Sequence, residues 1–281
     1  MDGMAEKAGE GGGGLPGISS LLLLGCGKMG GAMLEGWLAG GLAPARVQVI
    51  DPAPAKRLSA LAGEGLVLNP DQPVQPDVAV IAVKPQMMAE AAPRLAAFAG
   101  GGTMMLSIAA GTPIAAFEAM FGAETPIVRA MPNTPAAVGA GISAIVGNAA
   151  AGEAGLQRAE ALLAAVGETL RLGSEAEIDA VTALSGSGPA YVFHLIEAMA
   201  AAGVAQGLTE AQAMQLARAT VCGAGALAGA SEESAEQLRV NVTSPGGTTA
   251  AGLAVLMPEL GDLMTRTVGA ATERSRVLAK G

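Results

Sequence analysis

Aromatic residues and cysteines are scarce in this sequence, and each scarcity excludes a class of function. Aromatic side chains account for 2% of the 281 residues, and the formal net charge is −9. A chain with few stacking side chains and this negative charge is not expected to bind nucleic acid or an anionic membrane surface. The two cysteines, Cys26 and Cys222, are too few for a disulfide framework or a cysteine-based metal site. We expect no bound metal.

Long apolar runs and a signal sequence are lacking as well. Charged residues such as Glu197 and Arg218 interrupt the apolar stretches before they reach the roughly 20 residues that a membrane span needs. Residues 1–14 are acidic and glycine-rich, whereas a signal peptide is basic and then apolar. The sequence therefore predicts a soluble cytoplasmic protein without membrane partners, preceded by a disordered tail over residues 1–17.

Apolar strands alternate with helical segments in the first part of the chain. The predicted strands are 18–24, 46–50, 77–83, 103–108 and 127–131. The predicted helices between them are a first one carrying Met29, Met33 and Trp37 on one face, then 54–62, 87–97 and 113–121. This alternation is typical of a doubly wound parallel sheet with helices on both faces. We assign residues 18–172 to such a Rossmann-type α/β domain.

Alanine-rich helices replace the strands in the remaining segment, 173–281. Ser174 with Glu177 and Thr209 with Gln212 have the spacing of capping boxes, which places helix starts at both points. The predicted helices are 175–184, 189–206, 210–229, 232–240, 245–256 and 259–278. Their small-residue faces can pack on a second copy, so we expect this all-α domain to form a homodimer.

A glycine motif lies between the first strand and the first helix. Gly25-Cys26-Gly27-Lys28-Met29-Gly30 has the G-x-G-x-x-G pattern. The first glycine permits the tight turn, the second lets the backbone approach a diphosphate, and the third lets helix and strand pack closely. With 41 glycines in the chain a chance match is possible. Its position on the first strand-turn-helix unit nevertheless favours dinucleotide binding.

Asp51, at the end of the second strand, is a candidate for the adenosine ribose. An acidic side chain about 20 residues beyond the glycine motif accepts hydrogen bonds from the ribose hydroxyls and disfavours the 2′-phosphate of NADP. The nearby Lys56 and Arg57 could offset its charge, and a solvated loop aspartate is the alternative interpretation. Asp51 therefore slightly favours NAD over NADP as the cofactor.

Two further strands end in small residues at the carboxyl edge of the sheet, where open α/β sheets bind ligands. These tips are Ala82-Val83-Lys84-Pro85 and Ile108-Ala109-Ala110-Gly111. They could lie against the nicotinamide half, or Pro85 and Gly111 could merely end the strands. The loop Met131–Pro135, with two prolines, has the composition of a turn.

Ser244-Pro245-Gly246-Gly247-Thr248-Thr249 has the pattern of a helix start with an N-cap serine and a first-turn proline. Free amides at such a start suit a small carboxylate. Two glycines in a first turn weaken a helix without structural gain, which favours a binding role over a plain helix start.

Other polar residues give weaker indications. Ser185-Gly186-Ser187-Gly188 enters a helix and is consistent with backbone packing alone, and the only histidine, His194, is predicted to be a buried structural residue. No Cys–His, Ser–His–Asp or metal-ligand arrangement is present in the sequence. Catalysis is therefore expected to depend on positioning around a cofactor that carries the chemistry.

Together these segments resemble pyrroline-5-carboxylate reductase, from Ile18 to about Leu278. The resemblance lies in G-C-G-K-M-G at 25–30, A-V-K-P at 82–85, S-I-A-A-G at 107–111, R-A-M-P-N-T-P at 129–135, L-S-G-S-G-P-A-Y-V-F at 184–193 and S-P-G-G-T-T at 244–249. It implies a Rossmann domain followed by a helical dimerisation domain, with active sites completed across the dimer and dimers gathered into a decamer.

The resemblance also implies residue roles. The implied cofactor contacts are Gly25, Cys26, Gly27, Lys28, Met29, Gly30, Asp51, Asn69, Ala82, Val83, Lys84, Pro85, Ile108, Ala109, Ala110 and Asn241. The substrate contacts are Glu175, Thr248 and Thr249, to which the helix-start pattern adds Ser244 and Gly247. The family commonly has Asn or Gln at the position of Lys28 and a small polar residue at that of Asp51. The choice between NADH and NADPH therefore stays open.

The implied reaction reduces 1-pyrroline-5-carboxylate to L-proline, the last step of proline biosynthesis, by hydride transfer from NADH or NADPH. Amides around Gly247 and Thr248 would hold the substrate carboxylate, and Thr249 would act on the ring nitrogen as the catalytic residue. The alternatives are a reductase of another small carboxylate or imine and a non-catalytic sensor of the dinucleotide.

Overall fold

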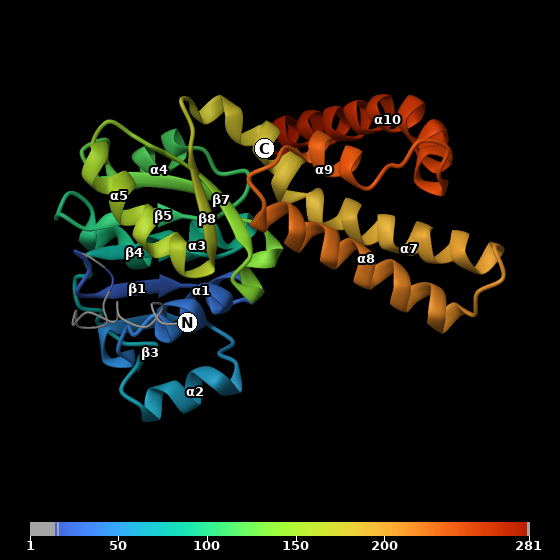
Figure 1. The fold of residues 1–281 in the computed structure, drawn as a ribbon. Coiled ribbons are helices and arrows are strands. Elements are labelled where there is room, and N and C mark those ends of the chain that lie inside the picture. Colours follow the sequence, from blue (N-terminus) through green and yellow to red (C-terminus); the bar gives the residue numbers. More distant parts are fainter. Residues whose placement is uncertain (1–14, 16, 280–281) are drawn as a thin grey trace, which may run out of the picture. The chain divides into compact units, whose positions relative to one another are not determined.

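The computed structural model describes residue 15 and residues 17–279 (Figure 1). The rest, including most of the tail predicted over residues 1–17, lies outside the described residues. The described chain divides into two compact units. The sheet unit runs to Val181 and includes the chain again from Ser275, and the helical unit comprises Thr182–Arg274. The predicted domain boundary at 172 falls inside the sheet unit of this division.

The sheet unit contains a mixed sheet with the strand order β3-β2-β1-β4-β5-β6-β7-β8. Its strands are β1 (Leu21–Leu24), β2 (Val47–Ile50), β3 (Val67–Leu68), β4 (Val78–Ile81), β5 (Met104–Ser107), β6 (Ile127–Met131), β7 (Gly141–Gly147) and β8 (Gly167–Arg171). Neighbouring strands are parallel except β6 and β7. The predicted doubly wound parallel sheet is confirmed from β1 to β6, and the strand order reverses between β1 and β4.

Three strands and one helix of this unit were not predicted. β3 has two residues, and the edge strand β8 is mostly exposed, so neither shows a buried apolar run. β7 begins and ends in glycine and returns antiparallel to β6. The helix α5 (Gly152–Leu163) lies between β7 and β8.

Helices cover both faces of this sheet. They are α1 (Lys28–Ala39), α2 (Lys56–Gly63), α3 (Met88–Ala91), α4 (Ile114–Phe121), α5, and α6 (Ile178–Val181). Alternate side chains of the strands pack on α1, α2 and α5 on one face and on α3 and α4 on the other. The helix predicted over 87–97 is shorter, because Pro93 lies at the start of a 3₁₀ segment, Ala92–Phe98, that follows α3.

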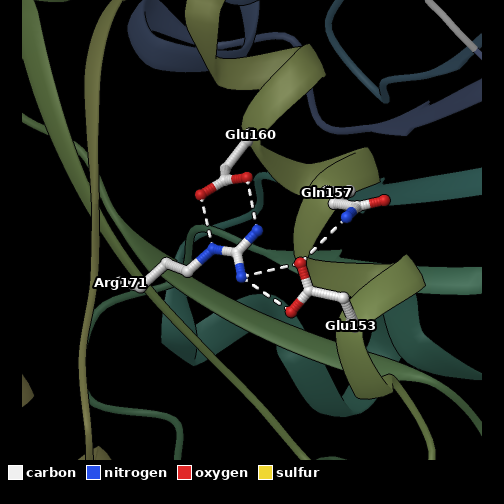
Figure 2. A network of polar contacts seen from close by, with 4 residues as sticks. All are labelled: Glu153, Gln157, Glu160 and Arg171. Carbon is white, nitrogen blue, oxygen red and sulfur yellow. Dashed lines mark hydrogen bonds and ion pairs between the residues drawn. The ribbon is translucent and has the colours of Figure 1, made fainter.

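A polar network fixes the exposed edge of the sheet (Figure 2). Arg171 on β8 binds Glu160 through Nε (2.6 Å) and Glu153 through Nη1 (2.7 Å), both on α5, and Gln157 adds a hydrogen bond to Glu153. These hydrogen bonds lower the pKa of both carboxyls and raise that of the guanidinium. Charged side chains on an edge strand also oppose pairing with another sheet.

The helical unit consists of α7 (Gly188–Ala205), α8 (Glu210–Ala230), α9 (Ala235–Asn241) and most of α10 (Thr248–Ala279), after a π-helical turn over Thr182–Gly186. Both predicted capping boxes are present, at Ser174 with Glu177 and at Thr209 with Gln212. The two helices predicted over 245–256 and 259–278 are wrong, because they form one helix with Pro258 inside it. The carbonyl of Ala254 that loses its donor lies on an exposed residue, where water can satisfy it.

The helical unit buries little of its own apolar surface. Its buried apolar cluster consists of Ala200, Ala213 and Ala217, with Ile196 packed against them. Large apolar side chains on α7, α8 and α10 are exposed, among them Phe193 (59%) and Val255 (70%). The stretch Glu175–Ala205 has the length and composition of a membrane span, but such a likeness is weak evidence by itself.

Candidate active site

The β1–α1 turn has the geometry that a dinucleotide diphosphate requires. Gly25 has φ +88°, and a Cβ there would come within 2.9 Å of Val83. A Cβ on Gly30 would lie 2.5 Å from the carbonyl oxygen of Gly25, so this glycine allows the close contact of helix and strand. A Cβ on Gly27 would meet nothing within 4 Å. That open space, beside the free amides that begin α1, fits a bound diphosphate.

A pocket of about 440 Å³ opens beside this turn, at the carboxyl ends of the first strands. Its lining includes Leu24 at the end of β1, Ile50 at the end of β2, Asn69 after β3 and Val83 after β4. The strand order reverses between β1 and β4, and open α/β sheets bind ligands at such a reversal. The pocket has the volume of a small-ligand site and suits the adenosine half of a dinucleotide.

Asp51 is held rigidly at the edge of this pocket. Its Oδ2 accepts a hydrogen bond from the backbone N–H of Cys26 (2.7 Å), and its Oδ1 accepts one from that of Ala53 (2.8 Å). Asn69 pairs with the Asp51 backbone in both directions, at 2.9 Å each. Asn69 has φ +49° and is the only described non-glycine residue with a positive φ. The side-chain pairing stabilises this unusual backbone conformation.

The basic residues near Asp51 in sequence do not offset its charge directly. Arg57 forms an ion pair with Glu35 on α1 (2.8 Å) and lies 3.9 Å from Glu64. Lys56 is exposed at the start of α2. Lys28, predicted near the phosphates, lies at the start of α1 and lines a separate hollow of about 460 Å³ along that helix.

The thiol of Cys26 lies within the same turn and is partly buried. Burial, together with the negative charges of Asp51 and Glu35, raises its pKa to about 11. The thiol is therefore protonated at neutral pH and a poor nucleophile. Its backbone, through the hydrogen bond to Asp51, connects the diphosphate turn with the ribose edge of the pocket.

The two predicted strand tips lie next to this turn in the sheet. The amide of Ala82 donates to Leu24 (2.8 Å), and that of Ile108 donates to Ile81 (3.0 Å). Ala109 is buried, whereas Ala110, Lys84 and Pro85 are exposed. The tips of β1, β4 and β5 thus form one continuous edge beside the turn.

Glu175 takes part in an ion pair that sequence reasoning missed. Its Oε1 accepts hydrogen bonds from Arg129 Nη1 (2.7 Å) and from the amide of Ile114 (2.8 Å). The Arg129 side chain is 8% exposed and that of Glu175 is 30% exposed. The pair joins β6, the start of α4 and the segment before α6. An arginine in the otherwise apolar run 127–131 was the available signal, because a buried arginine needs a partner.

The start of α10 differs from the prediction. The helix begins at Thr248, so Ser244 is not its N-cap and Pro245 is not in its first turn. Gly246 has φ +69°, which only glycine adopts readily, and the amide of Gly247 donates to the Ser244 carbonyl (3.0 Å). The two glycines therefore serve a turn, and the amide of Gly247 is not free. The first α10 residues, Thr248, Thr249 and Ala250, hold the amides open to an anion.

Three other predicted residues have local partners. His194 was predicted to be buried, which is wrong: its side chain is 82% exposed, with Nδ1 3.0 Å from Glu197. It lies on an exposed face of α7. Asn241 accepts from Gln237 and donates to Glu233. In the Met131–Pro135 loop, Asn133 accepts from the Ile142 amide (2.9 Å), so the loop serves as a structural turn.

Sequence reasoning also missed charged residues in the pocket beside Asp51. Asp71, Glu90 and Arg94 line it, and Arg94 donates to the carbonyl of Pro70 (3.2 Å). They come from loops and a short helix whose positions depend on the fold. Among the described residues, no group of three potential ligands could hold a metal ion.

A diphosphate turn at the reversal point of a Rossmann-type sheet, followed by a helical unit, defines an NAD(P)H-dependent oxidoreductase. A family model described as NADP oxidoreductase, coenzyme F420-dependent, matches residues 20–111, and one described as pyrroline-5-carboxylate reductase dimerisation matches residues 175–278. The chain is 39% identical to the pyrroline-5-carboxylate reductase of Pseudomonas aeruginosa over 265 residues, which cover 92% of this chain and 97% of that protein.

Solved structures support the same family assignment. The pyrroline-5-carboxylate reductase of Coxiella burnetii has a TM-score of 0.87 and 34% identity, covering 92% of this chain and 98% of that one. The Plasmodium falciparum pyrroline carboxylate reductase with NADP bound has a TM-score of 0.77 and 28% identity, covering 95% of this chain and 100% of that one. This chain belongs to the pyrroline-5-carboxylate reductase family.

Proposed function

We propose that this protein reduces 1-pyrroline-5-carboxylate to L-proline in the last step of proline biosynthesis. The observation that carries the proposal is the β1–α1 turn, with its open space at Gly27, in a chain of this family. NADH or NADPH, when bound, supplies the hydride for the imine carbon. The turn from Gly25 to Gly30 holds the diphosphate, and Asp51 with Asn69 borders the ribose.

The first residues of α10 bind the substrate in this proposal. The amides of Thr248, Thr249 and Ala250 are directed at the helix N-terminus, where a carboxylate is favoured. In the proposed site the Thr249 hydroxyl hydrogen-bonds the ring nitrogen as the imine becomes an amine. Glu175 and Asn241, implied by the resemblance, remain part of this proposal as substrate and cofactor contacts.

The exposed apolar faces of the helical unit favour a homodimer. Three alanines form its buried cluster, while Phe193, Val255 and other large side chains are exposed. A second copy is the partner that we propose, and the resemblance adds assembly of dimers into a decamer. Light scattering distinguishes the two assemblies and the monomer. The two free cysteines are compatible with the proposed cytoplasmic location.

Steady-state assays test the reaction. We expect oxidation of NADH or NADPH that depends on pyrroline-5-carboxylate, with much lower kcat/KM for small keto acids and other cyclic imines. Turnover of another substrate in its place would favour the alternative reductase. Dinucleotide binding without turnover of any of them would favour the sensor.

Thr249→Ala tests the catalytic assignment. Loss of a group that assists proton movement should lower kcat/KM by about 10²-fold without unfolding the protein. Thr249→Ser, which keeps a hydroxyl, should retain most of the activity. Thr265→Ala is the matched control, because this threonine lies further along α10 and bonds the Gly261 carbonyl (2.9 Å). Full activity of Thr249→Ala contradicts the assignment.

A further inference from the structure

We propose that the Asp51 carboxylate makes this protein select NADH over NADPH. The inference rests on the proposed function, because it concerns the dinucleotide that the β1–α1 turn holds. The 2′-hydroxyl of the adenosine ribose in NADH is a hydrogen-bond donor, whereas the 2′-phosphate of NADPH carries negative charge and donates little. The residue at the ribose edge therefore decides between them.

The position of the Asp51 carboxylate is fixed. Each oxygen accepts one backbone N–H, from Cys26 and from Ala53, and Asn69 holds the Asp51 backbone. A carboxylate oxygen accepts more than one hydrogen bond, so both retain capacity for ribose hydroxyls. The Cys26 contact places the carboxylate against the turn that holds the diphosphate. It cannot rotate away from a phosphate without losing these bonds.

The charges that line the pocket do not compensate for Asp51, and Lys56, exposed at the start of α2, is not part of that lining. Three carboxylates line the pocket, those of Asp51, Asp71 and Glu90, and Arg94 is the only basic residue in its described lining. Arg94 donates to the Pro70 carbonyl, and Arg57 is paired with Glu35 on α1. A 2′-phosphate would therefore meet a net negative wall, which costs binding energy.

Binding measurements test this inference without turnover. Titration of the full-length protein, followed by dinucleotide fluorescence, should give a Kd for NADH at least ~10-fold lower than that for NADPH. Asp51→Ser should reduce this ratio at least ~10-fold, mainly by strengthening NADPH binding. Asp71→Asn is the matched control, since it removes a charge from the same pocket and should change the ratio less than ~3-fold.

Two further measurements keep the test decisive if Asp51→Ser unfolds. Asp51→Asn keeps one acceptor oxygen for the backbone amides and should also lower the ratio. In the unmodified protein, adenosine 5′-monophosphate should displace NADH more effectively than adenosine 2′-monophosphate. Equal or tighter binding of NADPH by the unmodified protein overturns the inference, as does an equal effect of Asp51→Ser and Asp71→Asn. Selective NADH binding without reduction of pyrroline-5-carboxylate would instead contradict the proposed function alone.

Discussion

The guanidinium of Arg129 lies 2.7 Å from Oε1 of Glu175, and the arginine side chain is almost completely buried. The same oxygen accepts the amide of Ile114 (2.8 Å), so one carboxylate atom holds three separate segments of the sheet unit. Removing either partner leaves a charge behind. The two substitutions should lower the free energy of unfolding by different amounts, because the two side chains are unequally exposed.

Glu175→Leu should be the more damaging change. It leaves the Arg129 cation buried and unpaired, which costs about 3 kcal/mol of unfolding free energy. Arg129→Met leaves a carboxylate that is 30% exposed and keeps the Ile114 amide, so we expect about 2 kcal/mol. The double variant should lose less than the sum. Urea unfolding of the unmodified protein, the two single variants and the double variant gives the coupling energy between the two side chains. Additive losses of stability would contradict the ion pair.

Two glycines of the β1–α1 turn, Gly27 and Gly30, should respond differently to substitution by alanine. Gly30→Ala places a Cβ 2.5 Å from a backbone oxygen and should cost about 1–3 kcal/mol of stability. Gly27→Ala meets no protein atom within 4 Å, so stability should change by less than about 0.5 kcal/mol. Its methyl group occupies the diphosphate space, however, and should weaken NADH binding at least ~10-fold. Gly31→Ala is the control, because its added Cβ would lie no closer than 3.9 Å to another atom. It should change neither stability nor NADH binding strongly.

Cys26 should react slowly with iodoacetamide despite its partial exposure. In a Cys222→Ser background, alkylation should be slow near pH 8 and accelerate as the pH approaches about 11, the pKa of the thiol. Asp51→Asn removes one of the charges that raise this pKa and should accelerate the reaction at about pH 9. In urea the rate should follow the ordinary thiol pKa of 9.0. Rapid alkylation of the folded protein at neutral pH would contradict the described environment.

The Arg171 network predicts a pH-dependent contribution to stability. Hydrogen bonds from Arg171 lower the pKa of Glu153 and Glu160 in the folded protein below the ordinary 4.5. The network therefore stabilises the fold above pH 4.5 and loses this effect as the pH falls through the lowered values. The difference in urea midpoint between the unmodified protein and Arg171→Met should shrink over that range. A difference independent of pH would show that the network contributes only packing.

The sequence predicts five of the first six strands, because β1, β2, β4, β5 and β6 are buried on both faces and have continuous apolar sequences. It does not reveal β8, whose side chains are mostly exposed at the sheet edge. The glycine motif was located correctly because its spacing reflects contacts within one strand-turn-helix unit. Local patterns therefore suffice where the constraint is local.

The remaining errors concern contacts between distant segments. His194 lies among apolar residues in the sequence, but its side chain is exposed on α7, so the predicted burial is wrong. The glycines at 246 and 247 suggested a weakened helix, whereas the helix begins only after them. The hydrogen bond from Cys26 to Asp51 joins two segments 25 residues apart in the chain. No periodic pattern in the sequence indicates such a contact.

The small alanine cluster of the helical unit has a consequence for biosynthesis. A chain that has just left the ribosome can complete its sheet alone, because that core is internal. In its last third, Phe193, Val255 and similar side chains are exposed until the proposed homodimer forms. Maturation through the proposed homodimer would be a second-order process, fast when expression is high and slow when it is low. Dilute, newly made chains would be clients of chaperones and targets of proteolysis during that wait.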